Sequence, residues 1–198
     1  HSERHGDETM ATVRLIEGWT FRQFRAELAR AEALKPNSAG LSDEQVMAAL
    51  GRPGMSPEGR FHPDTYAYSK GSADLAVLKR AMHAMQQRLD AAWAERAADT
   101  PLRSADEALI LASIVEKETG RADERERVAA VFVNRLKANM RLQSDPTILY
   151  GLSGGKTVWS RPIQKTEIAQ KTAHNTYQID GLPPTPICNP GRASIEAV

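Results

Sequence analysis

The chain is organised around one stretch, Leu109-Ile110-Leu111-Ala112-Ser113-Ile114-Val115-Glu116-Lys117-Glu118-Thr119-Gly120. Ser104 stands before it as a helix N-cap, and Glu107 three residues later completes a capping box. Gly120 is a residue type that commonly follows the last turn of a helix. The sequence therefore predicts a nearly all-apolar helix that carries two carboxylates at its C-terminal end.

The two carboxylates differ in their surroundings, because helix residues three, four and seven apart share a face. The more apolar stripe consists of Leu111, Ile114 and Val115. Glu118 falls on this stripe, whereas Glu116 falls beside smaller side chains. Burying an unpaired charge is unfavourable, so we expect the Glu118 carboxyl to keep its proton, as a general acid requires. Periodicity alone leaves open that Glu118 is a solvated or ion-paired residue, the more common role near a helix end.

Composition limits the class of protein. The 198 residues can bury a core as one domain or as two small ones, and the net charge of +1 gives no general signal for binding nucleic acid. A hydrophobic content of 41% and a charged content of 26% fit an ordinary soluble globular protein. The single cysteine, Cys188, excludes an intrachain disulfide. No apolar run is long enough to span a bilayer, and no signal peptide is visible.

Patterning divides the chain into three parts. Residues 1–11 are polar and patternless, so we interpret them as a tag or a disordered terminus. Residues 12–100 are predicted to form a helical N-terminal subdomain, and residues 101–198 a second domain. The N-terminal subdomain is expected to contain a strand at 12–16, capped helices after Thr20 and Ser42, a loop over 51–71, and a long helix from Ser72 with a core-facing stripe.

The second domain is expected to continue beyond the Glu118 helix with further short elements. They are a solvated charge run at 121–127, a helix with its apolar face through Leu136, a turn at 142–147, a polar helix over 160–172, a strand at 174–179 and the start of a helix at Arg192.

Polar side chains gather in two of these segments. Gln143 and Asp145 can hydrogen-bond sugar hydroxyls and N-acetyl groups, although Asp145 could instead only cap a turn. On a strand, Asn175 and Tyr177 share a face. Tyr177 offers a stacking surface and a hydroxyl that suit a sugar ring, with cross-strand packing as the alternative.

Several blocks stand out in order along the chain. They are Glu-Gly-Trp-Thr-Phe (17–21), Pro-Glu-Gly-Arg-Phe-His-Pro-Asp-Thr-Tyr (57–66), Ala-Ser-Ile-Val-Glu-Lys-Glu-Thr (112–119), Glu-Arg-Val-Ala-Ala-Val-Phe-Val-Asn-Arg-Leu (126–136), Met-Arg-Leu-Gln-Ser-Asp-Pro-Thr (140–147), Asn-Thr-Tyr (175–177), Gly-Leu-Pro-Pro (181–184) and Asn-Pro-Gly (189–191). This series resembles the endolytic murein transglycosylase family, also called MltG or YceG-like. The resemblance implies an α+β fold, in which a helical N-terminal part packs on a YceG-like catalytic domain with a small mixed or antiparallel sheet.

The resemblance also implies a reaction. Glu118 would protonate the glycosidic oxygen between N-acetylmuramic acid and N-acetylglucosamine, and would then take a proton from the muramic C6 hydroxyl as that hydroxyl attacks C1. The product is a 1,6-anhydro sugar, and no metal or organic cofactor is required. Gln143, Asp145, Asn175 and Tyr177 would contact the substrate, as would Ser113 and Glu116 on the helix itself. An older label for the family implies a pyridoxal phosphate lyase, but no lysine context in this sequence favours a Schiff base.

Two other functions stay open at this point. One is a hydrolase of the same glycan (a muramidase), with Asp145 as base or nucleophile; the other is a glycan-binding module of the cell-wall synthesis machinery without turnover. Expected partners are peptidoglycan glycan strands and peptidoglycan synthases. Family members carry a membrane anchor and a LysM-like domain before this region and an aromatic strand region after it. We therefore expect a soluble fragment, truncated at its C-terminus, of a protein anchored at the periplasmic face of the inner membrane.

Overall fold

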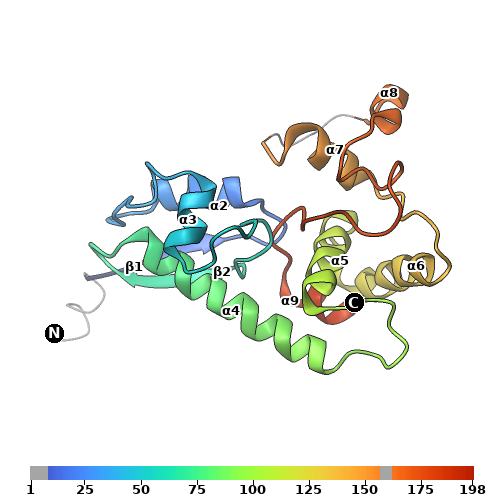
Figure 1. Cartoon of the computed structure of the whole chain (residues 1–198). Helices are drawn as coiled ribbons and strands as arrows, with labels where there is room; N and C mark the ends of the chain where they lie inside the picture. Colours follow the sequence, from blue (N-terminus) through green and yellow to red (C-terminus); the bar gives the residue numbers. More distant parts are fainter. Residues whose placement is uncertain (1–8, 157–161) are drawn as a thin grey trace.

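The computed structural model describes residues 9–156 and 162–198, so most of the predicted tag or disordered terminus and the first residues of the predicted 160–172 helix lie outside the described residues. The elements are β1 (Met10–Leu15), α2 (Phe21–Arg30), α3 (Asp43–Ala49), β2 (Asp64–Ser69), α4 (Asp74–Ala94), α5 (Ala105–Glu118), the 3-10 turn η1 (Ala122–Glu124), α6 (Arg125–Lys137), α7 (Asp145–Ser153), α8 (Lys165–Ala169) and α9 (Arg192–Ala197). The predicted α+β class is confirmed (Figure 1).

The sheet lies in the N-terminal half of the chain. Strands β1 and β2 pair antiparallel, with Met10 opposite Ser69 and Leu15 opposite Asp64. Strand β2 falls inside the segment predicted as loop, so that prediction was wrong. Tyr66 and Tyr68 alternate with exposed residues and are both buried, and this period-two pattern outweighs the flanking glycines and prolines.

Two clusters of buried side chains form the interior, and α4 contributes to both. Its first half gives Val77, Leu78 and Ala81 to a cluster with β1, β2, α2 and α3. Its second half gives Met85 and Leu89 to a cluster with α5, α6 and α9. Figure 1 shows α4 running from beside the sheet to beside α5 and α9. This helix therefore connects the two halves of the molecule.

Helix α5 is the centre of the second cluster, as its sequence predicts. The Ser104 hydroxyl accepts a hydrogen bond from the Glu107 N–H (3.2 Å), although the Glu107 carboxylate caps the N–H of Arg103 instead of that of Ser104. At the other end, Thr119 is extended (φ −141°) and its hydroxyl accepts from the Arg121 N–H, so the chain turns into η1 without a left-handed glycine. Gly120 therefore follows the C-cap residue Thr119, as predicted, but it does not adopt the left-handed conformation.

Four further expectations for the second half need correction. Residues 174–179 form turns, not a strand, and α7 is a helix where a turn had been expected. Within residues 162–172, the described part of the predicted polar helix, only α8 is helical. In the charge run expected to be solvated, Arg125 is buried. The predicted helix from Arg192 is confirmed as α9. In the described ranges, no helix is both long and apolar enough to cross a bilayer.

Candidate active site

The two carboxylates of α5 have the opposite burial from the one predicted. Glu118, the last residue of the helix, is exposed, while Glu116 is only 8% exposed. The apolar stripe is enclosed by the neighbouring helices through Val115, but the final turn emerges from them. Burial against apolar side chains is therefore not what would prepare Glu118 for acid chemistry.

What Glu118 has instead is a specific partner. The Ser144 hydroxyl donates a hydrogen bond of 2.9 Å to Oε2 of Glu118. Ser144 is the N-cap residue of α7, yet its side chain makes no cap hydrogen bond and is directed at Glu118. The other oxygen, Oε1, has no hydrogen-bond partner within the described residues. One carboxylate oxygen is thus fixed, and the other is open to a ligand.

A buried group of hydroxyls holds Ser144 in place. The Ser144 N–H donates to Oγ1 of Thr176 (2.9 Å), and Thr147 Oγ1 lies 2.8 Å from the same oxygen. The Gln143 N–H donates to the Thr176 carbonyl (3.2 Å). Gln143 itself has a φ of 54° and an exposed side chain. These contacts join the 143–147 and 175–177 segments beside the end of α5.

Asp145 and Tyr177 form a second polar pair at this place. The Tyr177 hydroxyl donates to Oδ1 of Asp145 at 2.7 Å. Partial burial, followed by the hydrogen bond to Asp145 and the negative charges of Asp145 and Glu118, raises the pKa of Tyr177 to about 12. The Tyr177 phenol therefore stays protonated at neutral pH and keeps its hydrogen bond to the Asp145 carboxylate.

Asn175 lies apart from this exposed group. Its amide nitrogen donates to the carbonyls of Ile168 and Gln170, its amide oxygen accepts from the Tyr177 N–H, and the residue is 1% exposed. Because the segment is a turn, Asn175 and Tyr177 do not share a strand face. The amide of Asn175 has its hydrogen bonds satisfied within the protein, so Asn175 orients Tyr177 rather than reaching outward.

Ser113 and Glu116 are also buried, with partners inside the protein. Ser113 accepts from the Ile187 N–H (3.0 Å) and ties α5 to the proline-rich segment. Glu116 pairs with Arg125 (3.0 Å) and accepts from the N–H of Gly191 (2.7 Å) at the start of α9. Both residues thus join α5 to the C-terminal segment, and neither lines a cavity at Glu118.

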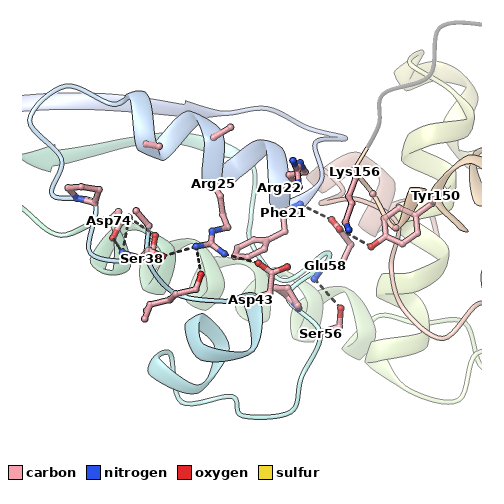
Figure 2. A pocket seen from close by; sticks show the side chains of 18 residues that line it. Phe21, Arg22, Arg25, Ser38, Asp43, Ser56, Glu58, Asp74, Tyr150 and Lys156 are labelled. Atoms are coloured by element: carbon pink, nitrogen blue, oxygen red, sulfur yellow. Dashed lines mark hydrogen bonds and ion pairs between the residues drawn. The ribbon is translucent and has the colours of Figure 1, made fainter. Parts of the chain in front are cut away.

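A groove runs from this region towards the N-terminal half. It has a volume of about 290 Å³, and its lining includes Asp145, Lys117, Tyr150 and Thr20. Neither Glu118 nor Ser144 lines the groove, but their chain neighbours Lys117 and Asp145 do, so Glu118 lies next to it. The groove meets a larger pocket of about 530 Å³ at Tyr150 and Gly155, which line both. Figure 2 shows the larger pocket, with Tyr150 beside Glu58.

Glu58 is the buried carboxyl of this larger pocket. Its Oε1 accepts from the Phe21 N–H (2.9 Å) at the start of α2, and its Oε2 accepts from the Tyr150 hydroxyl (3.0 Å) of α7. Burial raises its pKa to about 7, against the opposing effect of these two hydrogen bonds. Glu58 therefore bridges the two halves of the molecule and titrates near neutral pH.

Sequence reasoning placed Gln143 and Asp145 in the site but overlooked Ser144 between them. A serine directly before Asp-Pro is a helix-start signal, which would have indicated α7, although it predicts a hydroxyl that caps the helix and not one directed at Glu118. Nothing local marks Glu58 or Thr176, whose partners lie far away in the sequence. Across the described residues, no cluster of three or more His, Cys, Asp or Glu side chains could hold a metal ion.

Comparison with known proteins agrees with the predicted resemblance. The YceG-like family pattern matches residues 3–198. The endolytic murein transglycosylase of Bacillus subtilis (strain 168) is 33% identical over 140 residues, which are 71% of this chain and 38% of that protein. The protein of the same name from Streptococcus pneumoniae (strain D39) is 28% identical over 141 residues, or 71% of this chain and 25% of that one. The chain thus spans well under half the length of these relatives.

A solved structure is similar as well. The crystal structure of a yceG-like protein from Listeria monocytogenes aligns with 94% of this chain and 65% of its own length, at a TM-score of 0.74 and 26% sequence identity. Family pattern, relatives and fold all agree, and the pattern covers nearly every residue. This chain therefore belongs to the YceG-like family.

Proposed function

We propose that this chain carries the catalytic region of an endolytic murein transglycosylase, with Glu118 as its acid and base. The observation that supports it most is the Ser144–Glu118 hydrogen bond, next to a groove that Asp145 lines. It puts an accessible carboxyl group beside a largely apolar groove with polar side chains at its edge, and it fixes one oxygen of that carboxyl group. The relatives named endolytic murein transglycosylase point to the same substrate, the glycan strand of murein.

The reaction needs two proton transfers at one carboxyl group. Protonated Glu118 gives its proton to the oxygen that links N-acetylmuramic acid to N-acetylglucosamine, and the bond between C1 and that oxygen breaks. The muramic C6 hydroxyl then attacks C1 and yields its proton to the Glu118 carboxylate, which leaves a 1,6-anhydro ring. The acid is regenerated and no water is consumed. General acid–base catalysis of this kind contributes about 10² to 10⁴ in rate.

The neighbours of Glu118 suit this cycle. Ser144 donates to Oε2, which stabilises the carboxylate between the two transfers, and Oε1 is the oxygen that would carry the proton. The substrate brings its own nucleophile, so holding the C6 hydroxyl near C1 replaces the activation of a water molecule. Asp145 and the Tyr177 hydroxyl that it holds are positioned to hydrogen-bond sugar groups. Among the residues predicted to bind substrate, these two and exposed Gln143 are retained in this role.

A muramidase is the second candidate, because Asp145 places another carboxylate directly after Ser144. Such a hydrolase would use Asp145 to activate water, or as a nucleophile, while Glu118 acts as the acid. Tyr177 donates to Oδ1 of Asp145, so this oxygen already has a partner and is less available to activate a water, which favours the first candidate. The two reactions differ in their products, since hydrolysis adds one water to the new reducing end and ring closure adds none.

The test compares wild type, Glu118→Gln and Glu126→Gln on uncrosslinked glycan strands. Glu126 is exposed near the start of α6 and serves as the matched control. We expect Glu118→Gln to lose formation of anhydro ends, and both Glu126→Gln and wild type to form them at equal rates. Full activity in Glu118→Gln with an unchanged thermal unfolding curve would refute the assignment. New ends that carry added water would favour the muramidase.

The proposed substrate also implies a location in the cell. Murein lies outside the cytoplasmic membrane, so we place the reaction at the periplasmic face of that membrane, beside the peptidoglycan synthases that produce new strands. Fractionation of cells with an antibody against this chain, together with cross-linking to the synthases, tests both parts. Recovery of the protein in the cytoplasm would contradict this location.

A further inference from the structure

The larger pocket adjoins the groove next to the candidate active site. Asp145 lines the smaller groove next to Ser144, and this groove meets the 530 Å³ pocket at Tyr150 and Gly155. Gly155 has a φ of +79°, and a Cβ there would lie 2.8 Å from the Tyr150 ring. The absence of a side chain at Gly155 therefore keeps the junction between groove and pocket open.

The charges that line the pocket are unevenly paired. Arg25 is bound by Asp43 and by two backbone carbonyls, and Asp74 accepts from the N–H and the hydroxyl of Ser38. Both oxygens of Glu58 also have donors. Among the described residues, Arg22 and Lys156 have no such partner, and both are exposed. The two charged side chains of this pocket that have no hydrogen-bond or ion-pair partner in the described part of the chain are therefore both positive.

The two free cations stand at the end of the pocket nearest the groove. Figure 2 shows Arg22 and Lys156 near Glu58 and Tyr150, with Ser38 and Asp74 at the opposite end. Glu58, whose pKa is about 7, is partly neutral at physiological pH and opposes an incoming anion less than a full charge would. This end of the pocket is suited to an anionic group that arrives from the side of Glu118.

Much of the remaining lining is small and apolar, beside the larger side chains of Phe21, Leu41 and Tyr150. The small apolar side chains are those of Ala26, Ala29, Pro36, Ala39 and Pro57. Such a surface accommodates short aliphatic side chains and leaves room for extended backbone. A short peptide that combines alanine with carboxylates would match both the cations and this lining.

We propose that the pocket binds the acidic peptide that branches from the glycan strand, with Arg22 and Lys156 pairing its carboxylates. This inference rests on the proposed function, because a murein strand carries on alternate sugars a short peptide built largely from alanine and acidic residues and ending in a carboxylate. A strand whose linkage lies at Glu118 directs such a branch along the Asp145 groove. Arginine holds a carboxylate through paired hydrogen bonds, and lysine adds a point charge.

The test compares two forms of the same glycan strand, one with its peptides and one stripped of them by an amidase. We measure kcat/KM for both with wild type, the double variant Arg22→Gln/Lys156→Gln, and the control Arg30→Gln. Arg30 is an exposed arginine on the same helix as Arg22, outside the pocket. Wild type and control should prefer the peptide-bearing strand, and the ratio of the two kcat/KM values should fall about tenfold in the double variant.

Two results would overturn the inference. One is equal cleavage of the two strands by wild type, and the other is a double variant with the same ratio of kcat/KM values as wild type. If no form of the protein cleaves either strand, the proposed function fails, but peptide binding by the pocket can still be tested. Calorimetric titration with a free alanine- and glutamate-containing peptide then decides. Binding by wild type that the double variant lacks would support the pocket, and absence of binding by wild type would refute it.

Discussion

Replacing Glu58 by glutamine should flatten the dependence of stability on pH. Burial raises the folded-state pKa of Glu58 from 4.5 to about 7, so the folded protein binds a proton that the unfolded chain releases between these values. Stability from this group is fully present below pH 4.5 and is lost as the pH rises towards 7. Glutamine occupies the same space and has no proton to lose.

The size of the effect follows from the shift in pKa. One pKa unit corresponds to about 1.4 kcal/mol, so the whole shift is worth about 3 kcal/mol, of which about 2.5 kcal/mol falls between pH 5 and pH 8. The rest of the protein contributes equally to both forms, so the relevant quantity is the difference between the two proteins. Glu44→Gln, an exposed change on α3, controls for the loss of one negative charge.

The assay is urea unfolding of wild type, Glu58→Gln and Glu44→Gln at pH 5, 6, 7 and 8. The unfolding free energy of wild type should fall relative to Glu58→Gln by about 2.5 kcal/mol across this range, and Glu44→Gln should run parallel to wild type. Parallel curves for wild type and Glu58→Gln would refute the reasoning. They would mean that Glu58 is already ionised in the folded protein, or that its surroundings admit water.

The remaining predictions concern the contacts that build the site. Ser144→Ala removes the donor to Glu118 and should lower kcat on glycan strands about tenfold with an unchanged melting temperature; an unchanged kcat would contradict the role of Ser144. Arg125→Met leaves Glu116 buried without its cation and should lower the unfolding free energy by about 3–5 kcal/mol, whereas Glu116→Gln/Arg125→Met should lose clearly less; equal losses in urea unfolding would argue against the ion pair. Gly59→Ala would place a Cβ 2.5 Å from Pro186 at a φ of +82°, and should cost about 1–3 kcal/mol or more, against little change for Gly40→Ala, which has no neighbour within 4 Å.

The parts of the fold that depend on local signals could be predicted from the sequence. The capping boxes of α2 and α3, at Thr20–Gln23 and Ser42–Gln45, are both present, and α5 begins where Ser104 predicts. Each of these signals is complete within four residues. Strand β2 was missed because its partner β1 lies some fifty residues earlier, and because the surrounding glycines and prolines favour a loop.

The candidate site could not be predicted from the sequence alone, because it depends on tertiary contacts. A helical wheel separates Glu116 from Glu118 but does not say which of them the neighbouring elements cover. Arg125 and the start of α9 cover Glu116, while the last turn of α5 leaves Glu118 exposed. The contact between Ser144 and Glu118 spans 26 positions and depends on the buried hydroxyls of Thr147 and Thr176. Sequence pattern identified the segments of the site but not the side chain that touches the acid.

The most direct test of the account is digestion of uncrosslinked glycan strands in heavy-oxygen water, with mass analysis of every new end. Wild type should release ends that are one water lighter than reducing ends and carry no label, and Glu118→Gln should release none. Labelled reducing ends from wild type, or anhydro ends that persist in Glu118→Gln, would contradict the central claim that Glu118 closes the ring by returning a proton.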